Sequence, residues 1–356
     1  MSPYNNDIPI ISPVPQGVKR PLWSVMIPTY NCAEYLRETL ASVLAQDPGP
    51  DIMQIMVVDD HSLEDDPEAV VAELGKGRVE FYRQPQNVGI TKNFQTCLEL
   101  ARGELIHQLH GDDLVRDGFY QKMAQAFQQH PEIGAAFCRN VFIDEYNHWQ
   151  NLSDLEQKQS GILPSHWLNQ IAGVCCIQTP SIVVRRAVYE NLGGFNHRLK
   201  CGEDWEMWVR IAANYPIWYE IEALALYRVR SYSQTRRNVI NGHYIQNLYK
   251  AIEIFADYLP NTVPARVIQQ AKINCAYFAL ETAQGLFTRG DIGRAIAQIK
   301  LALQFAPQGK IIGSASKVIL WHGTLLLLST LALVPSKISR ILAKIHPIAV
   351  QGWKSS

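Results

Sequence analysis

Short apolar runs alternate with segments of helical periodicity throughout the first third of the chain. The runs that predict buried strands cover residues 22–27, 52–58, 79–82 and 104–109, and the helical segments cover residues 33–46, 67–74, 91–101 and 118–129. Strand and helix patterns that alternate at this spacing are typical of βαβ units, whose strands pair in parallel. The sequence therefore predicts an α/β fold, with an open, mainly parallel sheet and helices on both of its faces.

Polar residues follow three of the predicted strands, at the point where each strand ends. They are residues 28–31 (PTYN), 59–62 (DDHS) and 110–113 (HGDD). Because parallel sheets bind ligands at the carboxyl ends of their strands, we expect two carboxylate pairs to converge on one crevice. Carboxylates held that close repel one another unless a cation balances them, and a divalent metal with a diphosphate is a suitable partner. For Asp60 or Ser62 alone, capping of the next helix is the alternative.

From residue 130 to residue 235 the pattern becomes mixed. Strands are predicted at residues 133–142, 177–184 and 224–229, and a helix is predicted at residues 201–214. Glu203 and Asp204 open this helix, where the helix dipole stabilises a carboxylate in its charged form. That environment suits a base that must be ionised near neutral pH, although N-terminal capping is the alternative for an isolated Glu-Asp pair.

Five motifs occur in a fixed order along the chain: IPTYN (27–31), VVDDHS (57–62), NVGITKN (87–93), GDD (111–113) and GEDWEMW (202–208). In this order, and in this strand and helix context, they resemble the family 2 glycosyltransferases over roughly residues 22–235. The resemblance implies the GT-A fold, which is the nucleotide-diphospho-sugar transferase fold. It also implies an inverting transfer of a sugar from a nucleotide-diphosphate sugar to an acceptor hydroxyl, with Mn²⁺ or Mg²⁺ as cofactor. A UDP-sugar is the commonest donor in the family, and dTDP- and GDP-sugars are the alternatives.

The resemblance also assigns residues to the nucleotide. The nucleotide-binding residues that it implies are Pro28, Thr29, Tyr30, Asp59, Asp60, Lys92 and Asp112. Tyr30 is expected to stack on the base, and Asp60, supported by Asp59, is expected to accept a base N–H. Lys92 follows the NVG run and is expected to reach the base or the diphosphate.

The metal site departs from the family pattern at two positions. Asp112 matches the second acidic residue of the Asp-x-Asp element and Asp113 follows it, but His110 stands at the first acidic position. We expect these three residues to form the metal site, with Asp112 as the main ligand. Arg230 stands where the family often has a histidine. Arginine has no free lone pair for a metal, so we expect Arg230 to clamp a phosphate instead.

The GEDWEMW run implies the catalytic base. The resemblance makes Asp204 the group that takes the acceptor hydroxyl proton, with Glu203 as its neighbour and orienter. Trp205 and Gly194, together with Trp208, are expected on the acceptor side. For the two tryptophans, packing of a helix face in the core is the alternative.

The ends of the chain predict further segments. Residues 1–20 are polar and proline-rich and are expected to form a flexible leader, with the transferase domain at 21–235 and a helical region at 236–310. Within that region, residues 276–307 resemble a single tetratricopeptide hairpin with Gly290 at its turn. Residues 311–356 are expected to form apolar and amphipathic helices. The apolar stretch 318–334 could span a bilayer, lie on its surface beside Lys337, Arg340 and Lys344, or be buried.

Composition and the absence of certain motifs argue against several classes of function. Lys plus Arg and Asp plus Glu both number 33, so the chain lacks the basic field typical of a nucleic-acid-binding protein. The seven cysteines form no Cys-x-x-Cys pair, which favours reduced thiols and a cytoplasmic location, with the inner face of the cell membrane as an alternative site. No Gly-x-Gly-x-x-Gly turn follows the first strand, which excludes a dinucleotide-dependent oxidoreductase. The acceptor is expected to be a glycan or a lipid-linked sugar of surface polysaccharide or glycolipid synthesis. The alternative function is a non-catalytic scaffold on a degenerate transferase domain.

Overall fold

The computed structural model describes residues 7–230 and 233–330. The described chain forms two compact units. The first contains residues 7–171, 175–230 and 258–260, and the second contains residues 172–174, 233–257 and 261–330. The limits of the leader and of the domains given above stay predictions.

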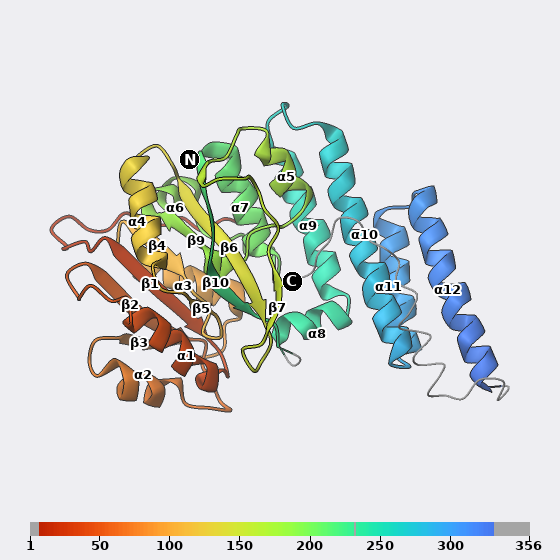
Figure 1. Ribbon diagram of the computed structural model, residues 1–356, viewed down its shortest axis with the longest axis horizontal. Helices are drawn as coiled ribbons and strands as arrows, with labels where there is room; N and C mark the ends of the chain where they lie inside the picture. The colour runs from red at the N-terminus through yellow and green to blue at the C-terminus, as the bar shows by residue number, and fades with distance from the viewer. Residues whose placement is uncertain (1–6, 231–232, 331–356) are drawn as a thin grey trace. The chain divides into compact units, whose positions relative to one another are not determined.

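The first half of the first unit has the predicted βα alternation (Figure 1). Its strands are β1 (Trp23–Thr29), β2 (Met53–Asp59), β3 (Glu80–Arg83) and β4 (Leu105–Gln108), and its helices are α1 (Ala33–Leu44), α2 (Pro67–Gly75), α3 (Ile90–Leu100) and α4 (Phe119–Gln129). The strands are all parallel and stand in the order β3-β2-β1-β4. Every strand and helix predicted before residue 130 is present.

The sheet continues beyond β4 with strands of both directions, in the order β9-β6-β10-β5. These are β9 (Ile182–Arg185), β6 (Ala135–Ile143), β10 (Ile217–Arg228) and β5 (Leu114–Val115), while β7 (Trp149–Leu152) pairs with β6 and β8 (Gly161–Ile162) pairs with β10. The longest of these ladders, between β6 and β10, is parallel. The result is the mixed, mainly parallel sheet that the sequence predicts. The connections include α5 (Trp167–Gly173), a 3₁₀ turn (Thr179–Ser181), α6 (Arg186–Leu192) and α7 (Glu203–Asn214).

Successive strand residues point to opposite sides of the sheet, so each face has side chains to bury, and helices cover both faces. Val25 and Ile27 of β1 belong to one core cluster with residues of α1 and α4. Ser24 and Gln54 lie between such positions and instead bind the end of α3: Ser24 accepts the Gly103 N–H at 2.7 Å, and Gln54 donates to the Leu100 carbonyl at 3.1 Å. A Cβ on Gly103 would lie 2.5 Å from the carbonyl carbon of Trp23, so only glycine allows this close approach.

Residues 8–12 of the N-terminal segment pack against the rest of the first unit, whereas most of residues 13–20 are exposed. Ile8 and Ile11 are buried. The Pro9 carbonyl accepts the Gly194 N–H at 2.8 Å, and the Ser12 carbonyl accepts from the Arg186 guanidinium at 2.9 Å. Residues 1–6 lie outside the described residues.

The second unit is helical, in agreement with the C-terminal helices that the sequence predicts. It contains α8 (Gln234–Ile240), α9 (His243–Tyr258), α10 (Ala265–Thr288), α11 (Ile292–Phe305) and α12 (Gly309–Thr330). The α10–α11 connection contains Gly290 at a φ of +82°, and Ala295 and Ala302 of α11 are fully buried. Among the described residues, no helix is both long enough and apolar enough to cross a bilayer. Residues 331–334 and the basic segment with Lys337, Arg340 and Lys344 lie outside the described residues.

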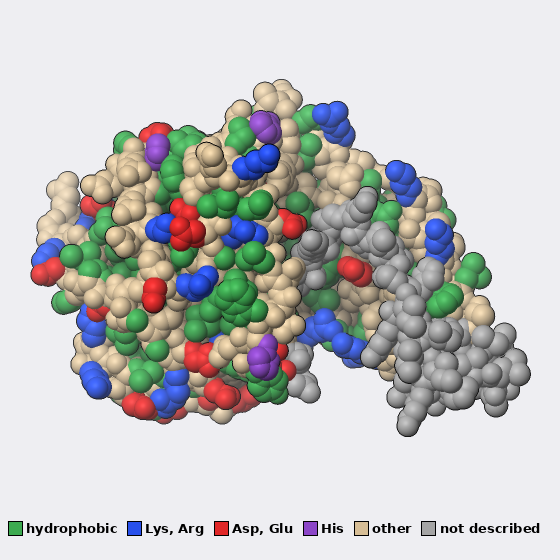
Figure 2. All heavy atoms as spheres, in the orientation of Figure 1, with side chains coloured by type: hydrophobic (Ala, Val, Ile, Leu, Met, Phe, Trp, Pro, Cys, Tyr) green, Lys and Arg blue, Asp and Glu red, His purple; other side chains and the backbone are tan. Residues whose placement is uncertain are grey.

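Charges of both signs are interspersed over the visible face, which agrees with the balanced composition (Figure 2). One ion pair is instead buried in the first unit. The Arg210 guanidinium lies 3.2 Å from the Glu206 carboxylate on α7, and both side chains are inaccessible to water. Arg210 also donates to the carbonyls of Leu192 and Gly194 at 2.7 Å, and the Tyr258 hydroxyl donates to Glu206 at 2.9 Å. This network fixes α7 against the loop that precedes it.

Arg210→Met is expected to lower the free energy of unfolding by about 3–5 kcal/mol, because it leaves the buried Glu206 carboxylate without its cation. Urea denaturation followed by circular dichroism measures the change. Arg37→Met is the matched control, since the Arg37–Glu73 pair is about half exposed and its loss is expected to change stability little. Equal effects of the two substitutions would contradict a special role for the buried pair.

Candidate active site

His110, Asp112 and Asp113 lie together in the turn after β4, as predicted. Their ligand atoms all lie within 4.8 Å of one another. His110 Nδ1 is 3.5 Å from Asp113 Oδ2, and Asp112 Oδ2 is 2.6 Å from the Arg230 guanidinium. The structure therefore brings the three predicted metal ligands and the predicted phosphate clamp to one place.

Close packing against β1 fixes this turn. The Gly111 N–H donates to the Pro28 carbonyl at 3.0 Å. A Cβ on Gly111 would lie 2.9 Å from Thr29 Oγ1 and 3.1 Å from Cys32 Sγ, so a larger residue would push the turn away from β1. On the other side, the Phe94 ring of α3 stacks on His110 with ring centroids 5.0 Å apart.

Arg228, at the end of β10, holds the two acidic residues and was missed in the sequence. Its N–H donates to Asp113 Oδ1 and its Nε donates to the Asp112 carbonyl, both at 2.8 Å. Its guanidinium also lies 2.7 Å from the Glu38 carboxylate. The run 227–230 contains two arginines, and the resemblance directed attention to Arg230 alone.

The donor atoms at this site fit a divalent metal. His110 Nε2 and Asp113 Oδ2 are buried and have no hydrogen-bond partner among the described residues. Burial lowers the pKa of His110, which favours the neutral imidazole that binds metals. Burial, followed by the charge of Asp112, raises the pKa of Asp113 well above its usual range. A bound cation would favour the carboxylate again, and a mixed nitrogen and oxygen set suits Mn²⁺ better than Mg²⁺.

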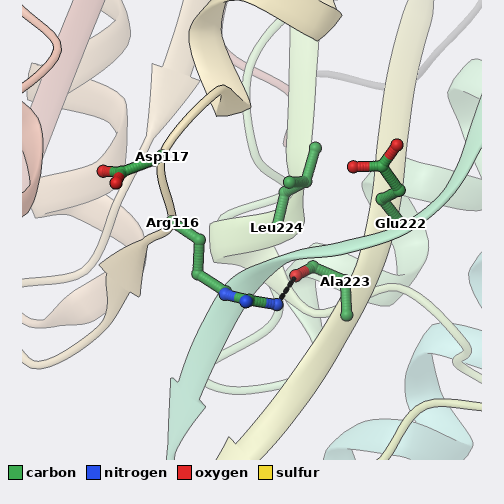
Figure 3. Close-up of a pocket in the computed structure, with 5 residues that line it drawn as sticks. All are labelled: Arg116, Asp117, Glu222, Ala223 and Leu224. Carbon is green, nitrogen blue, oxygen red and sulfur yellow. Dashed lines mark hydrogen bonds between the residues drawn. The ribbon is translucent and has the colours of Figure 1, made fainter.

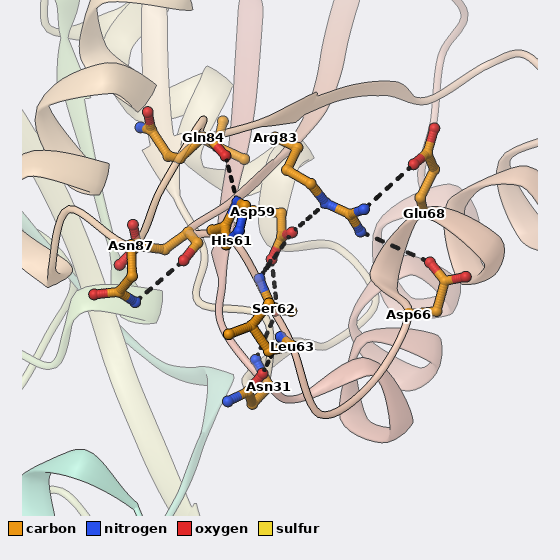
Figure 4. A network of polar contacts seen from close by, with 12 residues as sticks. Asn31, Asp59, His61, Ser62, Leu63, Asp66, Glu68, Arg83, Gln84 and Asn87 are labelled. Carbon is orange, nitrogen blue, oxygen red and sulfur yellow. Dashed lines mark hydrogen bonds and ion pairs between the residues drawn. The ribbon is translucent and has the colours of Figure 1, made fainter.

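The acidic pair at the end of β2 is divided between two tasks, and Figure 4 shows the contacts of Asp59. Asp59 is fully buried; it accepts the Ser62 hydroxyl at 2.5 Å and the Arg83 Nε at 2.8 Å. Asp60 accepts the N–H groups of Val88 and Gly89 at 2.7 and 3.0 Å. Asp59 thus shapes its own loop, whereas Asp60 joins that loop to the NVG run.

The other predicted nucleotide residues differ in accessibility. Pro28 and Thr29 are buried, and Thr29 Oγ1 lies 2.8 Å from Cys32 Sγ. Tyr30 is 45 % exposed at the rim, so its ring is available for stacking. Lys92 is exposed in the first turn of α3, where its charge contributes to the lowered pKa of His197, whose main cause is burial.

Glu203 and Asp204 stand at the start of α7, after Gly202 with a φ of +72°. Asp204 Oδ1 accepts the Trp205 N–H at 2.7 Å, while Glu203 Oε2 is buried without a hydrogen-bond partner in the described chain. Burial, followed by the charge of Asp204, raises the pKa of Glu203 to about 8. Burial also raises the pKa of Asp204, so desolvation outweighs the helix-dipole effect that we expected to keep the pair charged.

Tyr227 connects the two acidic groups. Its pKa is raised by burial first, and then by the charges of Asp113, Asp112 and Asp204. All three carboxylates therefore act electrostatically on one hydroxyl. The 3₁₀ turn links the two groups in space, because the Pro180 carbonyl lies 3.0 Å from His107 Nε2 on β4 and the Thr179 side chain hydrogen-bonds Asp204.

Trp205, Trp208 and Gly194 belong to the core, which corrects their expected place on the acceptor side. Both tryptophans are buried, and Trp205 Nε1 donates to the Ile171 carbonyl at 2.6 Å. A Cβ on Gly194 would lie 2.0 Å from Gln95 Oε1, so this position serves close packing. The two tryptophans are buried because they are large and apolar. The acidic start of α7 faces the site, while its aromatic residues fill the interior.

Sequence comparisons identify the family. A family model described as Glycosyl transferase family 2 matches residues 24–193. An uncharacterized protein of Mycobacterium tuberculosis is 31 % identical over 241 residues, which cover 62 % of this chain and 73 % of the relative. The chain belongs to glycosyl transferase family 2. The matched range includes Asp112 but ends before Asp204 and Arg230, so those two residues are placed by the structure of this glycosyltransferase.

Solved structures show the same fold. S. aureus TarS in complex with UDP-GlcNAc matches with a TM-score of 0.59 and 17 % identity, over 90 % of each chain. The mannosyltransferase PcManGT from Pyrobaculum calidifontis, in complex with GDP-Man and Mn²⁺, matches with a TM-score of 0.54 and 17 % identity, over 94 % of this chain and 88 % of that one. The glycosyltransferase therefore has the GT-A fold.

Glu203→Gln is expected to make the protein more stable at alkaline pH. An unfolded glutamate ionises near pH 4.5, whereas burial holds the pKa of folded Glu203 at about 8. Folding thus retains a proton between these values, so stability falls as the pH rises through this range and the full cost remains above it. Glutamine carries no charge and avoids this cost.

Thermal unfolding between about pH 5 and pH 9 measures the effect, with a gain in Tm of at least about 2 °C for the variant at the alkaline end. Glu73→Gln is the control: the pKa of exposed Glu73 is lowered, so its contribution is constant in this range. If wild type and Glu203→Gln lose stability in parallel with pH, Glu203 does not hold the proton.

Proposed function

We propose that this glycosyltransferase is an inverting, metal-dependent enzyme. It transfers a sugar from a nucleotide-diphosphate sugar, with a UDP-sugar as first choice, to a hydroxyl of a glycan or lipid-linked acceptor. The observation that carries the proposal is a pair of acidic groups joined by the 3₁₀ turn Thr179–Ser181, whose Pro180 carbonyl lies 3.0 Å from His107 Nε2 on β4 and whose Thr179 side chain hydrogen-bonds Asp204. One group, His110 with Asp112 and Asp113, suits a metal, and the other, Glu203 with Asp204, suits proton transfer.

The donor's base stacks on Tyr30 and meets Asp60, and its diphosphate extends toward Asp112. Exposed Tyr30 and the position of Asp60 beside the NVG run support this placement. Lys92 contributes positive charge at the same end of the sheet. UDP-GlcNAc and GDP-Man bound to TarS and PcManGT support a nucleotide sugar as donor class.

Asp112, Asp113 and His110 hold the metal, with Mn²⁺ preferred because one ligand is an imidazole nitrogen. Mn²⁺ in the PcManGT complex supports this choice. When bound, such an ion neutralises the charge that develops on the departing diphosphate. Arg230 pairs with Asp112 while no donor is bound, and it turns to a phosphate oxygen when the donor enters.

Asp204 removes the proton of the acceptor hydroxyl, which then attacks the anomeric carbon in one displacement. This step inverts the configuration and needs no covalent intermediate. A raised pKa makes the ionised form of Asp204 a stronger base than an ordinary aspartate. Glu203, which keeps its own proton near neutral pH, supplies an uncharged neighbour and limits repulsion at the base.

The cellular setting follows from the same proposal. We place the enzyme in the cytoplasm, with contact to the inner membrane surface through the apolar C-terminal stretch, in surface polysaccharide or glycolipid synthesis. The alternative is a non-catalytic scaffold, and the pairing of Arg230 with a metal-ligand candidate favours it. Donor turnover decides between the two.

Asp112→Asn is expected to abolish both the metal-dependent binding of the donor and its slow hydrolysis. Isothermal titration with UDP-, dTDP- and GDP-sugars, each with Mn²⁺, Mg²⁺ or chelator, measures donor binding, and electron paramagnetic resonance counts bound Mn²⁺ directly. Asp51→Asn is the control, because Asp51 forms only an exposed pair with Lys19. Failure of the wild type to bind any donor or Mn²⁺, with its fold intact, would support the scaffold.

Asp204→Asn is expected to lower the transfer rate by about 10²–10⁴-fold, which is the usual contribution of a general base. Donor affinity is expected to stay within about twofold, because Asp204 faces the acceptor hydroxyl. Steady-state rates and donor titrations separate the two effects. A variant that transfers sugar at the wild-type rate would exclude Asp204 as the base.

A further inference from the structure

A hollow of about 290 Å³ lies beside the active site and is not used by the mechanism above. It is lined by Arg116, Asp117, Glu222, Ala223 and Leu224. The two carboxylates stand on opposite sides of Leu224, and Arg116 reaches the Ala223 carbonyl (Figure 3). Its volume is close to the lower end of the range of about 300–1,000 Å³ for ligand pockets, which suits one or two sugar rings.

Irregular pairing of β10 creates this hollow. The register with β6 shifts on both sides of Ala223, so the strand bulges there. The Ala223 carbonyl accepts from Arg116 Nη1 at 2.8 Å, and the Glu222 carboxylate pairs with Lys122. Bulges re-aim side chains and are common next to active sites.

Trp149 extends the same surface. It opens β7, is 64 % exposed, and its ring centroid lies 5.6 Å from the Arg116 guanidinium carbon. Tyr146, in the turn before β7, is 72 % exposed. Both rings are therefore accessible to a binding partner. Arg116 therefore joins an exposed aromatic platform to a polar hollow.

We propose that Trp149, Arg116, Asp117 and Glu222 form a carbohydrate subsite that binds the acceptor glycan. A sugar ring presents an apolar C–H face, which stacks on an aromatic ring, and a rim of hydroxyl groups, which donate to carboxylates. Two carboxylates at the hollow disfavour a phosphate, and its charged lining disfavours an apolar peptide. A neutral glycan satisfies both parts of the surface.

Strand β5 joins the subsite to the active site. Strand β5 leads directly from Asp113 to Arg116, and at about 3.3 Å per residue this spans about 10 Å, a few sugar rings. The Arg116 N–H donates to the Leu224 carbonyl at 2.8 Å, on the strand whose end carries Arg228. The turn that leads to Trp149 begins at Asp144, whose carbonyl accepts from Arg228. An acceptor chain of several sugars reaches both places. This inference rests on the proposed function, since it names the acceptor class.

A microbial glycan array, probed with the full-length fluorescently labelled protein, tests the subsite. The wild type is expected to bind at least one class of oligosaccharide, and Trp149→Ala is expected to weaken its apparent affinity at least about tenfold, with Trp149→Phe restoring most of it. Glu222→Gln removes the negative charge of a group that accepts hydrogen bonds from sugar hydroxyls, without changing the size of the side chain. It is expected to weaken binding about tenfold as well, even where Trp149→Ala folds poorly.

Tyr82→Ala is the matched control, because Tyr82 is a partly exposed aromatic residue on β3, at the other edge of the sheet. Glycan binding that survives both Trp149→Ala and Glu222→Gln, or a wild type that binds no glycan on the array, would overturn the subsite. Binding of nucleotide sugars by the wild type is measured in parallel. Its failure would count against the transferase mechanism and leave the glycan result to be judged separately.

Discussion

One buried residue, Arg228, fixes the turn that carries Asp112 and Asp113: its backbone N–H donates to the Asp113 carboxylate, and its guanidinium donates to the Asp112 carbonyl. Its side chain is inaccessible to water, and it is compensated by the Glu38 carboxylate, the carbonyls of Asp112 and Asp144, and the Tyr35 ring 4.8 Å away. Removing any of these partners would leave a buried charge uncompensated, which costs more free energy than the loss of a contact at the surface. Arg228 therefore locks β10, α1 and the turn after β4 into one arrangement, and Asp112 and Asp113 inherit their positions from it.

A second buried arginine fixes the start of α7 in a similar way. Arg210 ties Glu206 to the carbonyls of the loop before α7, which fixes the helix whose first residues are Glu203 and Asp204. Glu203 Oε2 and Asp113 Oδ2 are buried at the site without hydrogen-bond partners among the described residues. Burial without that compensation explains the raised pKa values of Glu203 and Asp113.

Sequence predicted the sheet well because β1 and β2 are mostly apolar and are buried over their whole length, which is typical of parallel strands inside a sheet. It missed β5, β7 and β8, whose short or exposed segments lack a periodic pattern. The metal-ligand candidates were found because parallel strands end at one edge of the sheet and because the GDD run resembles the family's Asp-x-Asp element. Trp205 was misplaced because helical spacing does not show which face meets a ligand, and Arg228 was missed because its partners are distant in sequence.

The pairing of Arg230 with Asp112 couples metal binding to donor binding in the proposed mechanism. Asp112 Oδ2 has a guanidinium at 2.6 Å, so a metal that approaches this oxygen competes with a cation already present. A donor diphosphate offers Arg230 a new anionic partner and at the same time offers the metal further oxygen ligands. The donor thereby relieves the competition between the metal and Arg230 for Asp112, and the metal helps to balance the charge of the diphosphate. Linkage makes such an effect reciprocal, so metal and donor strengthen each other's binding, and the departure from histidine at position 230 becomes a source of coupling between them.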